Sequence, residues 1–143
     1  YKIFRRVITP LRHPLLKEKA VTLKALARYP LIVYDRRFSS GWRVLKAFEE
    51  QGIAPNIVLS AVDAESVKAY VEAGLGIAVI QALAYDPKRD KGIRALDPGD
   101  LFECPMAGIT LRRGSFLRSF TLEFIRLLAP EFDVSVMAGH GAV

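Results

Sequence analysis

The chain has 143 residues, of which 51% are hydrophobic, and its formal net charge is +6. This length fits one domain or a large part of one, and the apolar fraction excludes a disordered chain. Because the basic residues are scattered along the sequence, the charge alone does not predict a nucleic-acid-binding surface. The single Cys104 excludes an intrachain disulfide, and the two histidines, His13 and His140, do not suggest a metal site. We therefore expect neither a metal nor a cofactor.

The first two thirds of the chain alternate between strand and helix patterns. Apolar runs bounded by Pro, Gly and polar residues predict four strands, and apolar residues at helical spacing predict three helices between them. The predicted strands are residues 2–9, 31–34, 56–60 and 76–80, and the predicted helices are residues 22–28, 40–51 and 63–73. This order favours βαβ units and a mostly parallel central sheet flanked by helices, an α/β fold.

In the helix over 63–73, Asp63 is placed as the N-cap, and Val67, Tyr70 and Val71 are expected to face inward. The last third of the chain is less regular. Residues 93–96 and 108–113 predict short strands, and Ser115 is expected to cap a helix that ends before Pro130. In that helix Leu117, Phe120, Phe124, Leu127 and Leu128 form one apolar stripe, and residues 137–143 are expected to be a frayed tail.

The turn over residues 35–43 (DRRFSSGWR) joins a buried strand to a helix. The first N–H groups of a helix lack intrahelical partners, and together with the helix dipole they can hold a small anion. The pattern leaves two interpretations open. Either Ser39 or Ser40 is only a helix N-cap in a solvated loop, or this turn is one wall of an anion site.

Asp63 follows the next strand and lies at the same predicted edge of the sheet, where ligands bind in open α/β folds. Its two interpretations are helix cap and cleft residue. Trp42 is either a packing residue of the first helical turn or a lip of the crevice. The residues Ser39, Ser40 and Gly41 do not form a nucleophile elbow, because no glycine lies on the preceding side, and neither a dinucleotide fingerprint nor a phosphate loop is present. We expect no enzyme activity.

Several segments resemble the effector-binding domain of LysR-type transcriptional regulators, and within that family the CysB/Cbl group that controls sulfur assimilation. Residues 63–71 (DAESVKAYV) and 74–80 (GLGIAVI) are typical of the whole family. The pair Asp86–Pro87 and residues 111–120 (LRRGSFLRSF) are more specific to the sulfur-responsive group. The resemblance covers about residues 1 to 133.

The resemblance implies a two-lobed fold of the periplasmic-binding-protein type (type 2), with the effector bound between the lobes. Residues 1–106 would be the second lobe, residues 107–130 a crossover strand and helix returning to the first lobe, and residues 131–143 a C-terminal tail. Most of the first lobe and the winged helix-turn-helix would lie outside this chain. The apolar stripe would pack against the first lobe, so the chain alone is expected to expose it and to self-associate.

The resemblance also implies the effector and its contacts. In the CysB group the cleft binds a sulfate-like anion or an acetylserine-type molecule through hydroxyl groups and helix N-termini. The second-lobe hydroxyl falls on Ser39, where the family commonly has Thr, which leaves Ser40 as the cap. Arg36 and Arg37 replace uncharged residues and are expected to strengthen the preference for an anion. The predicted effector-binding residues are Ser39, Ser40, Phe38, Arg37, Trp42 and Asp63.

The implied function is effector sensing in a cytoplasmic transcription regulator of sulfur assimilation and cysteine biosynthesis. The regulator would be a homo-oligomer, a dimer or tetramer, that binds DNA only through its N-terminal domain and does not bind a membrane. The alternative is a solute-binding protein of a transporter, which shares the two-lobed fold.

Overall fold

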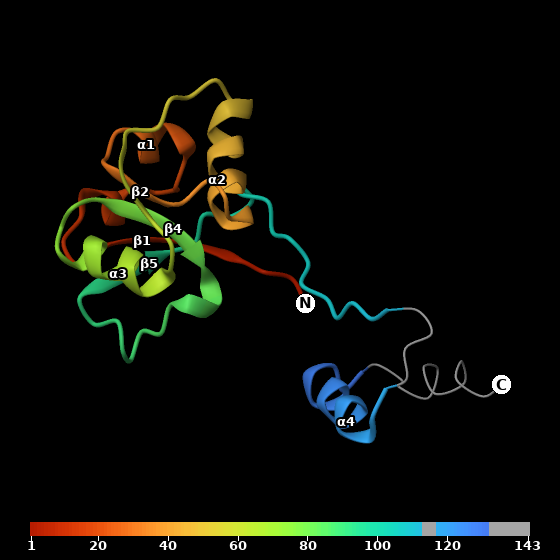
Figure 1. Ribbon diagram of the computed structural model, residues 1–143. Coiled ribbons are helices and arrows are strands. Elements are labelled where there is room, and N and C mark those ends of the chain that lie inside the picture. The colour runs from red at the N-terminus through yellow and green to blue at the C-terminus, as the bar shows by residue number, and fades with distance from the viewer. Residues whose placement is uncertain (113–116, 132–143) are drawn as a thin grey trace. The chain divides into compact units, whose positions relative to one another are not determined.

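The computed structural model describes residues 1–112 and 117–131 and divides the chain into two compact units, residues 1–106 and the part from residue 107 onward (Figure 1). The first unit contains every strand of the described part of the chain and all of its helices except one. Its elements in chain order are β1 (Arg5–Pro10), a 3-10 turn (Pro14–Lys17), α1 (Leu23–Ala27), β2 (Leu31–Tyr34), α2 (Ser39–Glu50), β3 (Ile57–Ala61), α3 (Ala64–Glu72), β4 (Ile77–Gln81), a 3-10 turn (Ala82–Ala84) and β5 (Ile93–Leu96).

The five strands form one sheet in the order β3-β2-β4-β1-β5. The strand β2 runs parallel to β3 and β4, whereas β1 runs antiparallel to both β4 and β5. The α/β fold predicted from the sequence is therefore confirmed, but the sheet is mixed rather than mostly parallel. The reason is that β1, the first strand in the chain, inserts between β4 and β5, and this pairing across about 75 residues leaves no trace in the local pattern.

Helices cover both faces of the sheet, with α1 and α2 on one side and α3 on the other (Figure 1). On the α1 and α2 side, the fully buried Phe48 of α2 packs on Val7, Leu31 and Ile77 of the sheet and lies 6.4 Å from the ring of Phe102. On the α3 side the core consists of Ile8, Ile32, Tyr34, Ala61, Val67, Val71, Ala78, Ile80 and Ile93. The two cores fix both helix layers to the strands that carry the candidate site.

The helix ends follow the predicted signals in most places. Thr22 accepts a hydrogen bond from the Ala25 amide, and Asp63 accepts one from the Ser66 amide, as expected of N-caps. Gly52 and Gly74 have positive φ values of 63° and 79° and end α2 and α3, where a side chain would be strained. These helix ends could be predicted from the sequence because each depends on residues only a few positions apart.

Two local predictions fail in the described residues, and a third falls outside them. Tyr70 is 37% exposed rather than buried, and the buried residues of the short helix α3 are Val67, Lys68 and Val71. Residues 108–112 are not a strand and pair with no described strand, while Arg113 lies outside the described residues. The last helix, α4 (Ser119–Leu128), begins at Arg118 as its N-cap, and the predicted cap Ser115 and residues 137–143 lie outside the described residues.

The apolar stripe on α4 is exposed, as predicted, in Phe120, Phe124, Leu127 and Leu128, while Leu117 is half-buried. Within residues 1–112 and 117–131, no helix is both long and apolar enough to cross a bilayer. In the same residues no group of three or more His, Cys, Asp or Glu side chains is placed to bind a metal ion.

Candidate functional site

The predicted site residues converge on one edge of the sheet. Because β2 is parallel to β3 and β4, the carboxyl ends of these three strands lie together, and the amino end of α2 follows the middle one. The amino end of β1 joins them, since Arg5 lies opposite Gln81, the last residue of β4. This is the edge at which open α/β sheets bind ligands.

The amino end of α2 is not capped by a serine side chain. The N-cap residue is Phe38, whose carbonyl accepts hydrogen bonds from the amides of Gly41 and Trp42 at 3.0 and 3.2 Å. The prediction that Ser40 is the cap is therefore wrong: Ser40 is the second residue of the helix, and its Oγ instead accepts a hydrogen bond from Gln81 Nε2 at 2.8 Å. Ser39, the first helical residue, is exposed. Among the described residues, no side chain therefore caps this end by a hydrogen bond.

Gly41 explains why the first turn of α2 lies so close to the sheet. A Cβ atom at this position would come closer than 3.0 Å to the carbonyl oxygens of both Tyr34 and Asp35. Because both contacts are with backbone atoms, neither can be relieved by a side-chain rotation. Because Gly41 has no Cβ, the amino end of α2 can lie directly against the end of β2.

The arginines of the turn are paired with carboxylates. Arg37 donates to both carboxylate oxygens of Asp35, with Nε–Oδ1 and Nη2–Oδ2 distances of 3.1 and 2.9 Å, and these bonds hold the pKa of Asp35 below its usual value. Arg36 pairs with Glu49 at 2.8 Å. Each of these charges is therefore paired locally, and the contribution of the two arginines to an anion site stays a prediction.

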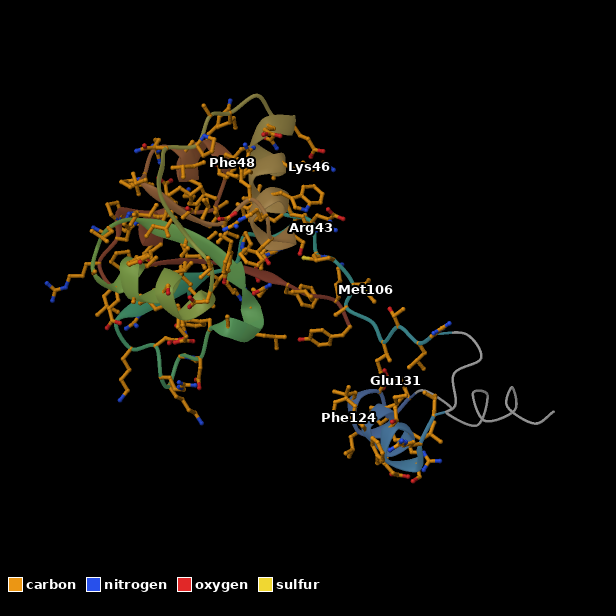
Figure 2. The ribbon with its side chains drawn as sticks, viewed as in Figure 1. Arg43, Lys46, Phe48, Met106, Phe124 and Glu131 are labelled. Atoms are coloured by element: carbon orange, nitrogen blue, oxygen red, sulfur yellow. The ribbon has the colours of Figure 1, made fainter. Side chains whose placement is uncertain are left out.

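The aromatic residues of the turn, Phe38 and Trp42, are both exposed. The guanidinium of Arg43 lies 4.9 Å from the centre of the Trp42 ring, and the ammonium of Lys46 lies 5.7 Å from it. Figure 2 shows Arg43 and Lys46 projecting from the same helix. Two cations thus lie within cation–π distance of the exposed Trp42 ring, and each is also paired with a carboxylate, Arg43 with Glu103 and Lys46 with Glu50.

Asp63 lies in the loop that joins β3 to α3 and is the N-cap residue of α3. Its carboxylate accepts hydrogen bonds from the amide and the hydroxyl of Ser66, both at 2.8 Å, and these bonds lower its pKa. The capping interpretation of Asp63 is therefore realised in the structure. Its role as an effector contact stays a prediction.

Arg5 was not predicted to take part in the site. Its side chain is 4% exposed, and among the described residues its Nε and Nη1 atoms have no hydrogen-bond partner. Burial lowers its pKa. The alternation of a strand that reads Phe4, Arg5, Arg6, Val7 could have indicated that one arginine points inward, because Arg5 and the buried Val7 share one face.

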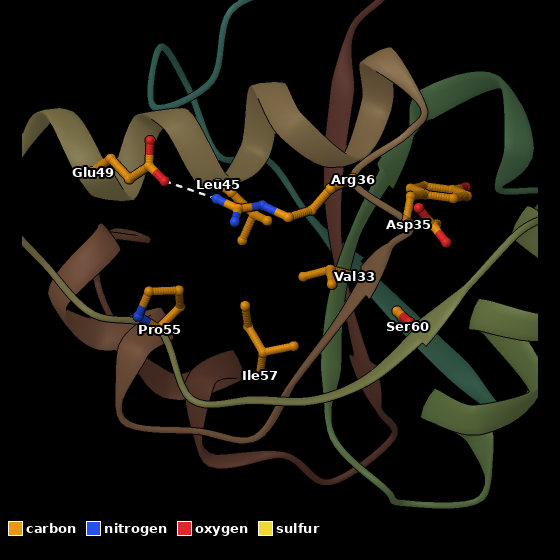
Figure 3. Close-up of a pocket in the computed structure, with 9 residues that line it drawn as sticks. Val33, Asp35, Arg36, Leu45, Glu49, Pro55, Ile57 and Ser60 are labelled. Carbon is orange, nitrogen blue, oxygen red and sulfur yellow. Dashed lines mark hydrogen bonds and ion pairs between the residues drawn. The ribbon is translucent and has the colours of Figure 1, made fainter.

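A second candidate site is a surface groove of about 440 Å³ between α2 and β3 (Figure 3). Val33, Leu45, Pro55 and Ile57 line its apolar part, and the Arg36–Glu49 ion pair lies across it. The charged groups in its lining are already paired, Arg36 with Glu49 and Asp35 with Arg37. It lies along an edge strand and offers an apolar surface rather than a seat for a charged ligand.

The arrangement at the amino end of α2 can bind an anion, since it combines helix amides, a hydroxyl and a buried guanidinium. It does not present a nucleophile next to a general base. His13, the one histidine in the described residues, accepts a hydrogen bond from the Leu15 amide and packs on Tyr29, both outside this site.

Comparisons with known proteins show which family the chain resembles. The model of the LysR substrate binding domain matches residues 4–133. The chain is 41% identical over 139 residues to the HTH-type transcriptional regulator SsuR of Burkholderia cenocepacia, covering 97% of the chain and 45% of that protein. It is 42% identical over 126 residues to the regulator CysB of the same organism, covering 88% and 40%. The chain therefore spans less than half the length of these relatives.

Among solved structures, the cofactor-binding domain of the Cbl transcriptional regulator superposes with a TM-score of 0.83 at 26% identity. That match covers the whole chain and 63% of the Cbl domain. The regulatory domain of CcmR from Synechocystis, solved in complex with 2-PG, has a TM-score of 0.71 at 19% identity, which shows a shared fold.

Proposed function

Because this chain belongs to the LysR substrate-binding domain family, in the group of CysB, Cbl and SsuR, we propose that it senses an effector of sulfur metabolism for a transcription regulator. In this proposal residues 1–106 are the second lobe of a two-lobed domain, and residues 107–130 return to the first lobe. DNA contacts belong to a part of the regulator outside this chain, and the regulator acts in the cytoplasm. Since the matched relatives are regulators, the transporter alternative is not favoured, and the domain is not an enzyme.

The observation that carries the proposal is the uncapped amino end of α2 at the carboxyl ends of three neighbouring strands. A small anion or an O-acetylserine-type molecule would bind there and be enclosed by the first lobe. The effector would contact Ser39 and lie near Phe38, Ser40 and Trp42. An effector of this kind changes the regulator only if it binds one arrangement of the lobes more tightly than the other.

Removal of the Ser39 hydroxyl tests this placement. We expect Ser39→Ala to weaken binding of sulfate or O-acetylserine by about 1 kcal/mol, because one hydrogen bond to the effector is lost. Calorimetric titration of the two-lobed protein measures the change. Ser60→Ala is the matched control, since Ser60 lines the groove between α2 and β3 instead. Equal affinities for Ser39→Ala and the unmodified protein would remove Ser39 from the site.

We also propose that the regulator is a homo-oligomer that uses the free edge of β3. This strand lies at the border of the sheet, and its Ile57, Val58 and Leu59 side chains are exposed. An exposed apolar edge strand is a template for pairing with another chain, and here we assign it to a second copy.

A lysine on this edge should block the pairing. We expect Val58→Lys to convert the oligomeric two-lobed protein into smaller species, as measured by sedimentation velocity. Val62→Lys, at an exposed position just beyond β3, should leave the oligomer intact. A monomeric unmodified protein at high concentration, or an unchanged oligomer with Val58→Lys, would refute the role of this edge.

A further inference from the structure

Arg5 carries a charge that the described residues do not balance. Its side chain is 4% exposed, and its Nε and Nη1 atoms are shielded from solvent without a hydrogen-bond partner in residues 1–112 and 117–131. The next residue, Arg6, is more exposed and forms an ion pair with Asp97. Burying a guanidinium without a counter-charge lowers the stability of the folded state, so the presence of Arg5 here requires an explanation.

The position of Arg5 links it to the amino end of α2. Arg5 lies directly opposite Gln81 in the antiparallel pair of β1 and β4, and opposed residues point to the same face of a sheet. The side-chain amide of Gln81 donates a hydrogen bond to Ser40 in the first turn of α2 at 2.8 Å. The Arg5 side chain therefore lies on the same face of the sheet as the first turn of α2, and its cross-strand neighbour Gln81 contacts that turn.

The charged groups around Arg5 leave a net positive environment. The groups that influence it are Tyr34, Cys104, Arg43 and Glu103. The one carboxylate among them, Glu103, is already paired with Arg43, whose own Nε atom is buried and lacks a partner among the described residues. The single carboxylate near these two guanidinium groups therefore forms its ion pair with Arg43. The amino end of α2 adds partial positive charge of its own.

We propose that Arg5 provides the counter-charge for an oxyanion of the effector, either inorganic sulfate or the carboxylate of an acetylserine-type molecule, bound at the amino end of α2. The inference rests on the proposed effector site and adds the residue that selects a charged ligand over a neutral one. A charge surrounded by protein acts on a nearby anion more strongly than a charge in water. Arg5 is in this sense a specificity-determining residue, and its burial is stabilised when the effector binds.

The test compares thermal unfolding of the 143-residue chain and its Arg5→Met and Arg6→Met variants, in sulfate and in chloride of equal ionic strength. We expect Arg5→Met to raise the midpoint in chloride, because an uncompensated buried charge is removed. We also expect it to reduce the extra stabilisation by sulfate, since sulfate affinity falls about tenfold. Sulfate also stabilises proteins without binding. Arg6→Met, which should respond like the unmodified chain, shows that losing an arginine outside the site does not by itself change the response to sulfate.

Titration with O-acetylserine and with its methyl ester, which lacks the carboxylate, identifies the source of the oxyanion. Loss of the sulfate response alone in Arg5→Met assigns the site to an inorganic oxyanion, and loss of the O-acetylserine response relative to the ester assigns it to a carboxylate. Arg5→Lys, which keeps the charge, should retain part of either response if Arg5→Met fails to fold.

An Arg5→Met variant that keeps both responses while Ser39→Ala reduces them would refute the role of Arg5 and leave the proposed effector site intact. A lower midpoint for Arg5→Met in chloride would show that Arg5 is structural. If the unmodified chain, Arg5→Met and Ser39→Ala all respond equally to every one of these ligands, the inference and the proposed site both fail.

Discussion

A Gly41→Ala variant is expected to lose about 3 kcal/mol of stability, because overpacking against a fixed backbone costs this much or more. The new methyl group would lie closer than 3.0 Å to the carbonyl oxygens of Tyr34 and Asp35. Those carbonyls belong to the end of β2 and the start of the turn, so the amino end of α2 has to move away from the sheet. Effector binding should fall together with stability.

The sign of the Gly41→Ala effect makes the experiment decisive. In an unconstrained helix the same substitution stabilises by about 1 kcal/mol, since alanine is the better helix former. Urea unfolding of the variant measures the difference, and Gly108→Ala is the control, because no atom lies within 4 Å of a Cβ at that position. A Gly41→Ala variant as stable as the unmodified protein would mean that α2 does not need its close contact with β2.

The second large effect is expected at Lys68, a lysine that is 7% exposed on α3. Its Nζ atom lies 3.0 Å from Asp90 and 2.8 Å from Glu65. Lys68→Met leaves the mostly buried Asp90 carboxylate without its cation and should cost about 3 kcal/mol. Lys46→Met, which breaks the exposed pair with Glu50, should cost no more than about 0.5 kcal/mol. Equal unfolding midpoints for the two variants would contradict this difference.

The same pair predicts how stability depends on pH. Burial alone would raise the pKa of Asp90, but the hydrogen bond from the Asp86 amide and the Lys68 charge outweigh it and lower the pKa below 3.8. A carboxyl group with a lowered pKa in the folded state stabilises above its unfolded pKa, and that contribution is lost as the pH falls through the folded value. Acid unfolding below pH 3.8 should therefore be less steep for Asp90→Asn than for the unmodified protein.

Local signals predicted the parts of the fold that depend on neighbouring residues. The strand β2 and the caps Thr22 and Asp63 are where the pattern placed them, since each depends on a hydrogen bond or an apolar run within a few residues. The cap of α2 was predicted wrongly for the opposite reason. Ser40 is held by Gln81, 41 residues away, and no local pattern reports that contact.

The electrostatic content of the site depends on the same long-range contacts. The sequence suggested Arg36 and Arg37 as the cations of the site. In the structure Arg36 pairs with Glu49, and Arg37 pairs with Asp35. The unpaired guanidinium belongs to Arg5, which reaches the site only because β1 inserts between β4 and β5. The turn over residues 35–43 therefore remains the predicted effector site, and Arg5 of the sheet is the further cation that we propose for it.

The central claim is that an anionic effector binds at the amino end of α2. Amide chemical-shift mapping of the chain during titration with O-acetylserine tests it most directly, because it locates even weak binding. We expect shifts confined to the amides of residues 38–42 and to Arg5 and Gln81. Shifts concentrated instead around Leu45, Ile57 and Ser60, in the groove between α2 and β3, would contradict it.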